Sequence, residues 1–217
     1  MRQIAFVLFL LCTPLVLAQQ TPPAEPGTPP AATPPTAAPP AEATPAPPPA
    51  PTGPPRVRID TSLGSFVVKL DQDRAPLTVD TFLRYVREGF YDGTVFHRVI
   101  NNFVAQGGGY DAKYQIKMPH GKLVNESGNG LTNRRGTIGM ARAEGPHSAT
   151  SQFYLNLADN PDLNPLPTRW GFAVFGEVIE GMDVVDRMGH VATGKSASFE
   201  QDAPVKPIVI ERARILE

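Results

Sequence analysis

Cysteines, long apolar runs and clustered metal ligands are scarce or absent in this sequence of 217 residues. The one cysteine, Cys12, lies within the first 18 residues, so residues 19–217 can form no disulfide. The four histidines, at positions 97, 120, 147 and 190, follow no metal-binding spacing, and we expect no metal and no other cofactor. Packing alone must therefore hold the fold together.

The sequence also has no excess of positive or negative charge. With Arg2, Glu25 and Glu42 set aside, residues 56–217 contain 19 basic and 19 acidic side chains. A domain that binds nucleic acid usually has a basic excess. We therefore expect no nucleic acid as a partner, and no membrane surface as the main partner.

The apolar run in residues 1–18 follows a basic start at Arg2 and ends at Val16-Leu17-Ala18. This pattern predicts a secretory signal peptide. Because the run is shorter than the roughly 20 residues that span a bilayer, an uncleaved membrane anchor is the weaker alternative. Lipidation of Cys12 is disfavoured because the bulky Leu11 precedes it. We expect export to the periplasm or another extracytoplasmic compartment.

Residues 19–55 hold 16 of the 25 prolines, mixed mainly with alanine and threonine. Such a segment buries too little apolar surface to offset the entropy cost of ordering, so it predicts a disordered spacer. A sharper hypothesis is that this tail enters the substrate cleft of its own domain. Residues 56–217 are long enough for one well-buried domain.

Residues 56–217 contain many short segments in which apolar and polar residues alternate, the pattern of β-strands. A hairpin is predicted around 61–64, and further strands at 95–100, 103–106, 137–142, 152–157, 172–178 and 206–215. One helix is expected between Pro76 and Gly89, with Asp80 in its first turn, and a short one at 182–188. Residues 107–109 are interpreted as a turn and 110–135 as an irregular loop. Many strands with two helices favour a closed antiparallel barrel.

The most informative stretch of the sequence is Phe96-His97-Arg98-Val99-Ile100-Asn101-Asn102-Phe103-Val104-Ala105-Gln106-Gly107-Gly108. Strand residues two apart share a face, so Phe96 and Arg98 are expected on one face and His97 on the other. We interpret His97 as a packed, structural histidine. A cation beside aromatic rings and an amide suits a substrate that is apolar yet carries one polar bond, such as an X-Pro peptide.

This stretch resembles the signature of the cyclophilin family of peptidyl-prolyl isomerases. The segments 140–142, 151–154, 172–176 and 181–185 resemble later family segments in the same order, so the likeness runs from about Val57 to Ile215. It implies a closed, eight-stranded antiparallel β-barrel capped by two α-helices, and prolyl isomerase activity. The loop at 110–135 is most similar to that of bacterial secreted cyclophilins.

The resemblance also implies roles for individual residues. Arg98 would be the catalytic donor, Phe103 the floor of the proline pocket, and Gln106 the partner of the carbonyl before proline. The substrate-binding residues it implies are Val104, Met140, Ala141, Arg142, Gln152, Tyr154, Leu163 and Phe172. The expected partners are proline-containing unfolded or extended polypeptides, bound by a monomer.

Each of the three catalytic assignments has a non-functional alternative. Arg98 could be a surface residue or half of an ion pair, Phe103 could only fill the core, and Gln106 could be a structural amide. Three positions depart from the family pattern, with Asp162 replacing an aromatic residue, Tyr154 a phenylalanine and Arg142 an asparagine. We expect the Tyr154 hydroxyl to lie at the pocket edge. Trp170 is expected to lie too far along the chain to replace the aromatic residue missing at Asp162. We therefore expect weak cyclosporin binding. Alternative functions are a non-catalytic Pro-peptide binding module or chaperone on a stalk, and a barrel for a small ligand.

Overall fold

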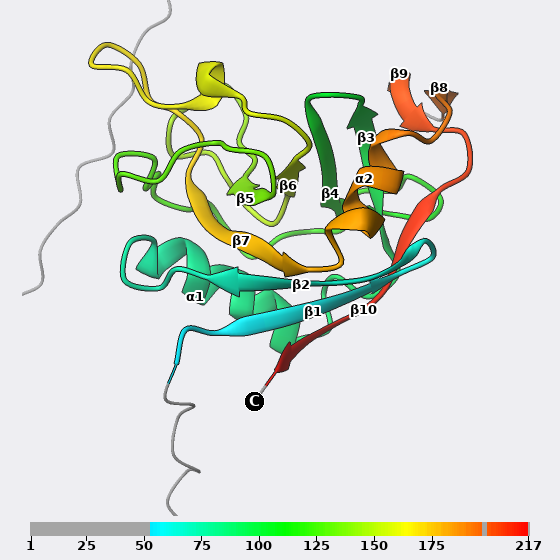
Figure 1. Ribbon diagram of the computed structural model, residues 1–217, viewed down its shortest axis with the longest axis horizontal. Helices are drawn as coiled ribbons and strands as arrows, with labels where there is room; N and C mark the ends of the chain where they lie inside the picture. The colour runs from blue at the N-terminus through cyan, green and yellow to red at the C-terminus, as the bar shows by residue number, and fades with distance from the viewer. Residues whose placement is uncertain (1–52, 197–198, 217) are drawn as a thin grey trace, which may run out of the picture. The chain divides into compact units, whose positions relative to one another are not determined.

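A closed antiparallel barrel forms the centre of the protein. The computed structural model describes residues 53–196 and 199–216, so the predicted signal peptide and nearly all of the predicted linker lie outside the described residues. The barrel strands are β1 (Arg56–Thr61), β2 (Gly64–Leu70), β3 (Thr94–Ile100), β4 (Val104–Asp111), β5 (Thr137–Met140), β6 (Phe153–Asn156), β7 (Val174–Glu180) and β10 (Ile208–Leu216). Their order is β1-β10-β3-β4-β6-β5-β7-β2 (Figure 1). The predicted eight-stranded barrel is confirmed.

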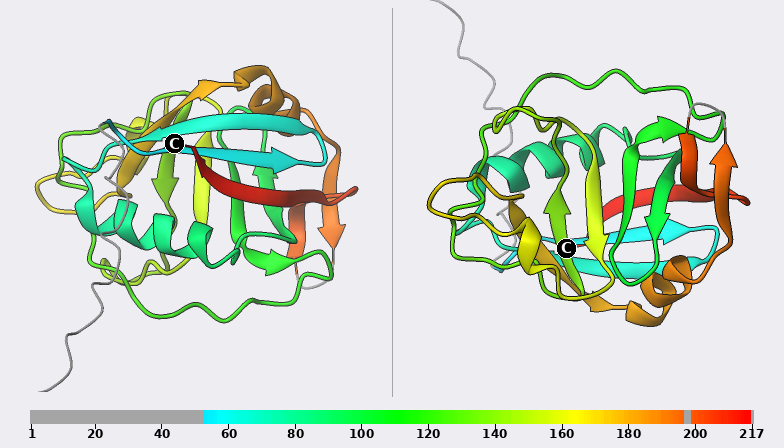
Figure 2. Two further views of the ribbon diagram at one scale, coloured as in Figure 1. Left: turned by 90° about the horizontal axis from the view of Figure 1, so that it is seen from below. Right: turned by 90° about the horizontal axis from the view of Figure 1, so that it is seen from above.

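The two helices, α1 (Pro76–Arg87) and α2 (Met182–Gly189), lie on opposite sides of the barrel (Figure 2). Proline suits the first helical position because its missing N–H would have no partner there. The first turn of α1 contains no acidic residue, so the prediction for Asp80 is wrong. The carboxylate of Glu126 instead accepts hydrogen bonds from the backbone N–H groups of Leu77 (3.1 Å) and Thr78 (2.8 Å). The long loop therefore caps the helix.

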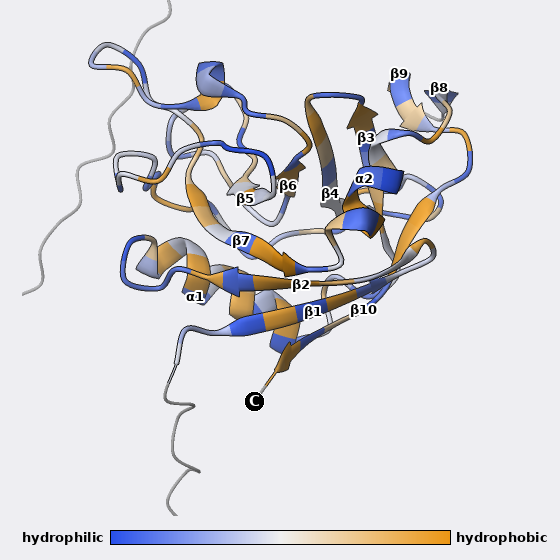
Figure 3. Ribbon diagram, in the orientation of Figure 1, coloured by the Kyte–Doolittle hydropathy of each residue, from blue (hydrophilic) through white to orange (hydrophobic). Residues whose placement is uncertain are grey.

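Aromatic rings fill the barrel interior. Apolar and polar residues alternate along β1, as Figure 3 shows, and the main core takes Val57 and Ile59 from this strand and Phe66, Val68 and Leu70 from β2. The ring of Phe82, on α1, lies 5.2 Å from Tyr91, 5.5 Å from Phe153 and 5.2 Å from Phe175, measured between ring centroids. These contacts join α1 to the strands without any disulfide.

The glycine run at 107–109 lies within β4, so its interpretation as a turn is wrong. Gly108 has φ +80°, and a Cβ there would lie 2.9 Å from the rings of both Phe153 and Tyr91. The β3–β4 register shifts on both sides of Phe96. The glycines therefore allow a bulged strand to pass close to the core rings.

This irregularity also breaks the expected alternation along β3. Phe96 and Val99, three residues apart, both belong to the main buried core. The side chain of Arg98 is 37% exposed, whereas Phe96 is fully buried, so the predicted shared face of these two residues is wrong. A bulge adds a residue to one strand and shifts the two-residue period there.

A small second sheet lies beside the barrel. It consists of β8 (Thr193–Ser196) and β9 (Phe199–Pro204), and β9 lies against β3 (Figure 1). A short 3-10 helix, η1, spans Pro161–Leu163. The sequence pattern predicted none of these three elements. As predicted, the segment between β4 and β5 is irregular, although β4 continues to Asp111.

Candidate active site

Three of the expected site residues lie in one row across neighbouring strands. Arg98 of β3 pairs in register with Gln106 of β4, and Gln106 pairs with Tyr154 of β6. Residues directly opposite each other in antiparallel strands project to the same face with their Cβ atoms about 5 Å apart. The Gln106 Nε2 donates a hydrogen bond to Oε1 of Gln152 (2.9 Å), which fixes the amide at the centre of the row.

A small apolar cluster lies beside this row and is separate from the main core. It contains the buried Val104, Ala141 and Tyr154, with Phe103, Leu163 and Phe172 partly buried against them. All six were expected in the substrate site. Because three of the six side chains remain partly open, the cluster offers an apolar surface on which a ring can pack.

Four expected residues line one hollow next to the cluster. Its lining residues are Gln106, Ala141, Arg142, Ala143, Ser148, Thr150 and Gln152. The structure thus joins strand β4, the end of β5 and the segment before β6 at one place. Residues separated by up to 46 positions in the sequence meet there.

Met140 is an exception among the expected residues. It is 2% exposed and packs in the main buried core rather than in the apolar cluster. Ala141, the next residue, belongs to the cluster. Since successive strand residues point to opposite faces, the two cannot both line the site. This placement counts against contact between Met140 and substrate.

The hydroxyl of Tyr154 is buried, so the expectation that it lies at the pocket edge is wrong. It donates a hydrogen bond to Oδ1 of Asn133 (2.6 Å), and burial raises the pKa of Tyr154 well above its usual value. Only the ring faces the cluster, where it meets Phe172 edge-on with centroids 6.1 Å apart. At this position the phenol therefore contributes apolar surface, like the phenylalanine that it replaces.

Buried asparagines that the sequence analysis missed support the site from behind. Asn156 donates to Oδ1 of Asn133 (3.2 Å), and Asn160 donates to Oδ1 of Asn156 (2.7 Å). Asn160 also donates to the backbone carbonyl of Phe103 (2.9 Å). This amide network connects the Tyr154 hydroxyl to the backbone of the proposed pocket floor. Isolated asparagines in a sequence give no signal of such partners.

The guanidinium of Arg142 is held by the backbone around it. It donates to the carbonyl oxygens of Ala143 (3.1 Å), Glu144 (3.2 Å), Trp170 (3.0 Å) and Gly171 (3.2 Å). Its central carbon lies 4.6 Å from the centroid of the Phe172 ring, a cation–π distance. Arg142 therefore clamps two loops over the cluster. Trp170 meets the His147 ring edge-on, with centroids 5.2 Å apart, and it does not join the apolar cluster, as expected.

Arg98 has one charged neighbour in the described part of the chain. Its Nε lies 3.9 Å from Oδ2 of Asp202, on β9, and within residues 53–196 and 199–216 its guanidinium makes no hydrogen bond. The side chain is partly shielded rather than extended into bulk solvent. Hydrogen-bond donors thus remain unengaged next to Gln106. The sequence analysis did not identify Asp202.

His97, next to Arg98, is packed rather than catalytic in position, as predicted. It is 2% exposed, and its ring centroid lies 4.6 Å from that of Tyr110 and 5.3 Å from that of Phe199. Burial lowers the pKa of His97 to about 4, and the Arg98 charge acts in the same direction. The imidazole is therefore neutral at pH 7.

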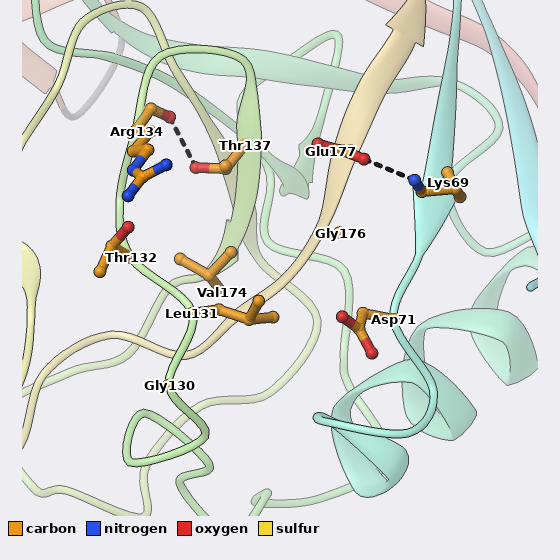
Figure 4. A pocket seen from close by; sticks show the side chains of 10 residues that line it. All are labelled: Lys69, Asp71, Gly130, Leu131, Thr132, Arg134, Thr137, Val174, Gly176 and Glu177. Carbon is orange, nitrogen blue, oxygen red and sulfur yellow. Dashed lines mark hydrogen bonds and ion pairs between the residues drawn. The ribbon is translucent and has the colours of Figure 1, made fainter.

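Another hollow lies elsewhere on the barrel, between β2, β7 and the segment before β5. Figure 4 shows its lining, including the Lys69–Glu177 ion pair (2.6 Å) and the hydrogen bond from the Thr137 hydroxyl to the Arg134 carbonyl (2.7 Å). It shares no residue with the expected site. Among the described residues there is no cluster of potential metal ligands and no helix long and apolar enough to cross a bilayer.

The sequence matches the family model described as cyclophilin type peptidyl-prolyl cis-trans isomerase/CLD over residues 56–215. It is 51% identical over 163 residues to the peptidyl-prolyl cis-trans isomerase cyp18 of Streptomyces antibioticus. This alignment covers 74% of this chain and 98% of that protein. It is 48% identical over 164 residues to peptidyl-prolyl cis-trans isomerase B of Escherichia coli. This second alignment covers 74% of this chain and 99% of the Escherichia coli protein.

A solved structure shares the fold. A cyclophilin type peptidyl-prolyl cis-trans isomerase of Cryptosporidium parvum, solved in the presence of the dipeptide Ala-Pro, aligns with a TM-score of 0.62 at 26% identity. The alignment covers 75% of this chain and 99% of the other. The barrel, the clustered site residues and these likenesses agree. This chain belongs to the cyclophilin family of peptidyl-prolyl cis-trans isomerases.

Proposed function

We propose that this protein isomerises X-Pro bonds in exported polypeptides and so assists their folding. The observation that carries the proposal is the position of Arg98, whose uncommitted donors lie beside Gln106 and the partly open Phe103 cluster. The names of the relatives and the Ala-Pro dipeptide of the structural neighbour support the same chemistry.

The reaction needs a donor rather than a nucleophile, because no covalent bond is made or broken. Rotation about the X-Pro bond breaks amide resonance across a barrier of about 18–20 kcal/mol. Unaided, it takes tens to hundreds of seconds. In the twisted state the proline nitrogen loses conjugation and gains a lone pair that can accept a hydrogen bond. A donor aimed at this nitrogen stabilises the transition state more than the ground state, and so it raises the rate.

We assign this donor to Arg98, which is always charged and carries five N–H groups. A single well-placed donor contributes about 3–4 kcal/mol. Reaching milliseconds requires on the order of 6–7 kcal/mol, since each 1.36 kcal/mol is a factor of ten. The rest comes from seating the proline ring on Phe103, removing water from the amide and holding the preceding carbonyl at Gln106.

The proposed setting is an extracytoplasmic compartment, because residues 1–18 have the pattern of a signal peptide. The domain contains no cysteine, so an oxidising compartment poses no problem for its folding. We further propose weak cyclosporin binding, because the exposed Asp162 stands where the family usually has an aromatic residue. Nanomolar inhibition by cyclosporin would contradict this.

The decisive experiment is a coupled peptide isomerisation assay on the wild type and Arg98→Ala. We expect kcat/KM to fall at least about 100-fold while the circular dichroism spectrum is unchanged, in line with the loss of one transition-state donor. Arg212→Ala is the matched control, since it removes an exposed arginine from β10, and its rate should equal that of the wild type. If Arg98→Ala and the wild type bind proline peptides and both fail to accelerate isomerisation, the protein is a binding module instead.

A further inference from the structure

The β8–β9 sheet is fastened to the strand that carries Arg98. Its residue Phe199 packs on the ring of His97, the residue before Arg98, with centroids 5.3 Å apart, and on the ring of Tyr110 at 5.1 Å. At the other end of β9, the hydroxyl of Tyr114 donates to the carbonyl of Pro204 (3.2 Å). Both ends of β9 are thus fixed, and Asp202 lies between them.

Asp202 adopts a conformation that a non-glycine residue rarely takes. Its φ is +65°, in the left-handed region where the Cβ crowds the backbone. The β8–β9 register is irregular here, because Gly194 pairs with Ala203 while Ser196 pairs with Phe199. The extra residues of β9 form a bulge that contains Asp202. Bulges beside active sites commonly redirect a side chain, and this one places the Asp202 carboxylate 3.9 Å from Arg98 Nε.

We propose that Asp202 is a positioning residue that orients Arg98 for catalysis. The proposal rests on the proposed function and adds a second charged residue to it. The carboxylate attracts the Nε side of the guanidinium, and the two terminal nitrogens stay available to the substrate. A long arginine side chain has many rotamers, and a fixed partner reduces the entropy lost when the guanidinium meets the proline nitrogen.

A purely structural role predicts a different outcome. Partly exposed ion pairs add little to stability because solvent screens them, and the Arg98 and Asp202 side chains are 37% and 26% exposed. Replacing Asp202 should therefore affect turnover much more than folding.

The informative variant is Asp202→Gly, because glycine accepts the positive φ at no steric cost while the carboxylate is lost. We expect kcat/KM to fall about five- to tenfold with no decrease in Tm. Glu200→Gln is the matched control. It removes a negative charge from the same strand, but Glu200 pairs with the exposed Lys195 (3.0 Å), so its rate should match that of the wild type.

A double-mutant cycle tests whether Asp202 acts through Arg98. In the Arg98→Ala background, adding Asp202→Gly should change kcat/KM by less than twofold. An equal loss in both backgrounds, or no loss in the wild-type background, would overturn the proposal. An inactive wild type, or an Arg98→Ala variant with full activity, would instead refute the proposed function.

A spectroscopic readout is independent of turnover. The Nε–H resonance of Arg98 can be assigned in ¹⁵N-labelled protein by its loss in Arg98→Ala. We expect Asp202→Gly to shift this resonance towards that of a free arginine, and Glu200→Gln to leave it unchanged. A resonance that does not move in Asp202→Gly would also overturn the proposal.

Discussion

At the scale of single residues, the Tyr154 hydroxyl separates support of the site from contact with the substrate. Tyr154→Phe removes the buried hydrogen bond to Asn133, whose Oδ1 still accepts from Asn156. We expect the free energy of unfolding to fall by about 1 kcal/mol, because the acceptor keeps one partner. Urea unfolding measures this loss.

The rate of the same variant provides the second measurement. Because only the ring of Tyr154 faces the cluster, kcat/KM should stay within about twofold of the wild type, a free-energy change under 0.5 kcal/mol. A large loss of activity with unchanged stability would mean that the hydroxyl reaches the substrate.

The β8–β9 pair shows which elements the sequence could not predict. Each barrel strand contains apolar residues, in alternation with polar ones in β1 and as a short buried run in β6, and such patterns predict all eight barrel strands. The segment Thr193–Ser196 contains no apolar side chain to alternate, and it is a strand only because it pairs with β9. Packing of Phe199 on His97 and Tyr110 supplies the remaining support, and such contacts leave no local pattern.

The start of helix α1 provides a prediction at the scale of one element. Glu126 satisfies the N–H groups of Leu77 and Thr78 and the Thr78 hydroxyl, so its carboxylate is the N-terminal cap of this helix. We expect Glu126→Ala to lower the free energy of unfolding by about 1–2 kcal/mol, the usual cost of losing a cap. Chemical denaturation measures it.

Glu180→Ala is the control for this experiment, because it removes an exposed carboxylate from β7. Its free energy of unfolding should stay within about 0.5 kcal/mol of the wild-type value. Equal stabilities for Glu126→Ala and Glu180→Ala would show that the helix does not need this cap. The sequence could not predict it, because the capping residue lies 48 positions beyond Thr78.

At the scale of the whole molecule, the sequence predicts the barrel correctly, and the structure brings most of the expected site residues together; the prediction fails where the backbone is irregular. The two-residue period requires regular strands, and the bulge near Phe96 breaks it, so faces assigned by counting were wrong there. Met140 was assigned to the site by resemblance and lies in the core. Asp202 and Asn133 could not be found, since each meets its site partner only after the chain has folded.

The stability of the whole protein should depend on pH through His97. Its pKa is about 4 in the folded protein, because burial and the neighbouring Arg98 charge disfavour the imidazolium. In the unfolded chain it is about 6.5. Between these two pKa values, His97 is therefore protonated in the unfolded state and neutral in the folded state. Stability from this group is complete above about pH 6.5 and decreases as the pH falls towards 4, by about 3 kcal/mol in total.

Variants distinguish this histidine from the carboxylates that titrate in the same range. His97→Phe keeps an aromatic ring against Tyr110 and Phe199 and removes the titrating group, so urea unfolding should vary less between pH 7 and 4.5 than in the wild type. His190→Phe, at an exposed position, should retain the full wild-type dependence. The relevant quantity is the difference between the variants, because carboxylates contribute equally to all three proteins. If His97→Phe loses as much stability on acidification as the wild type, the buried imidazole is not what destabilises the fold in acid.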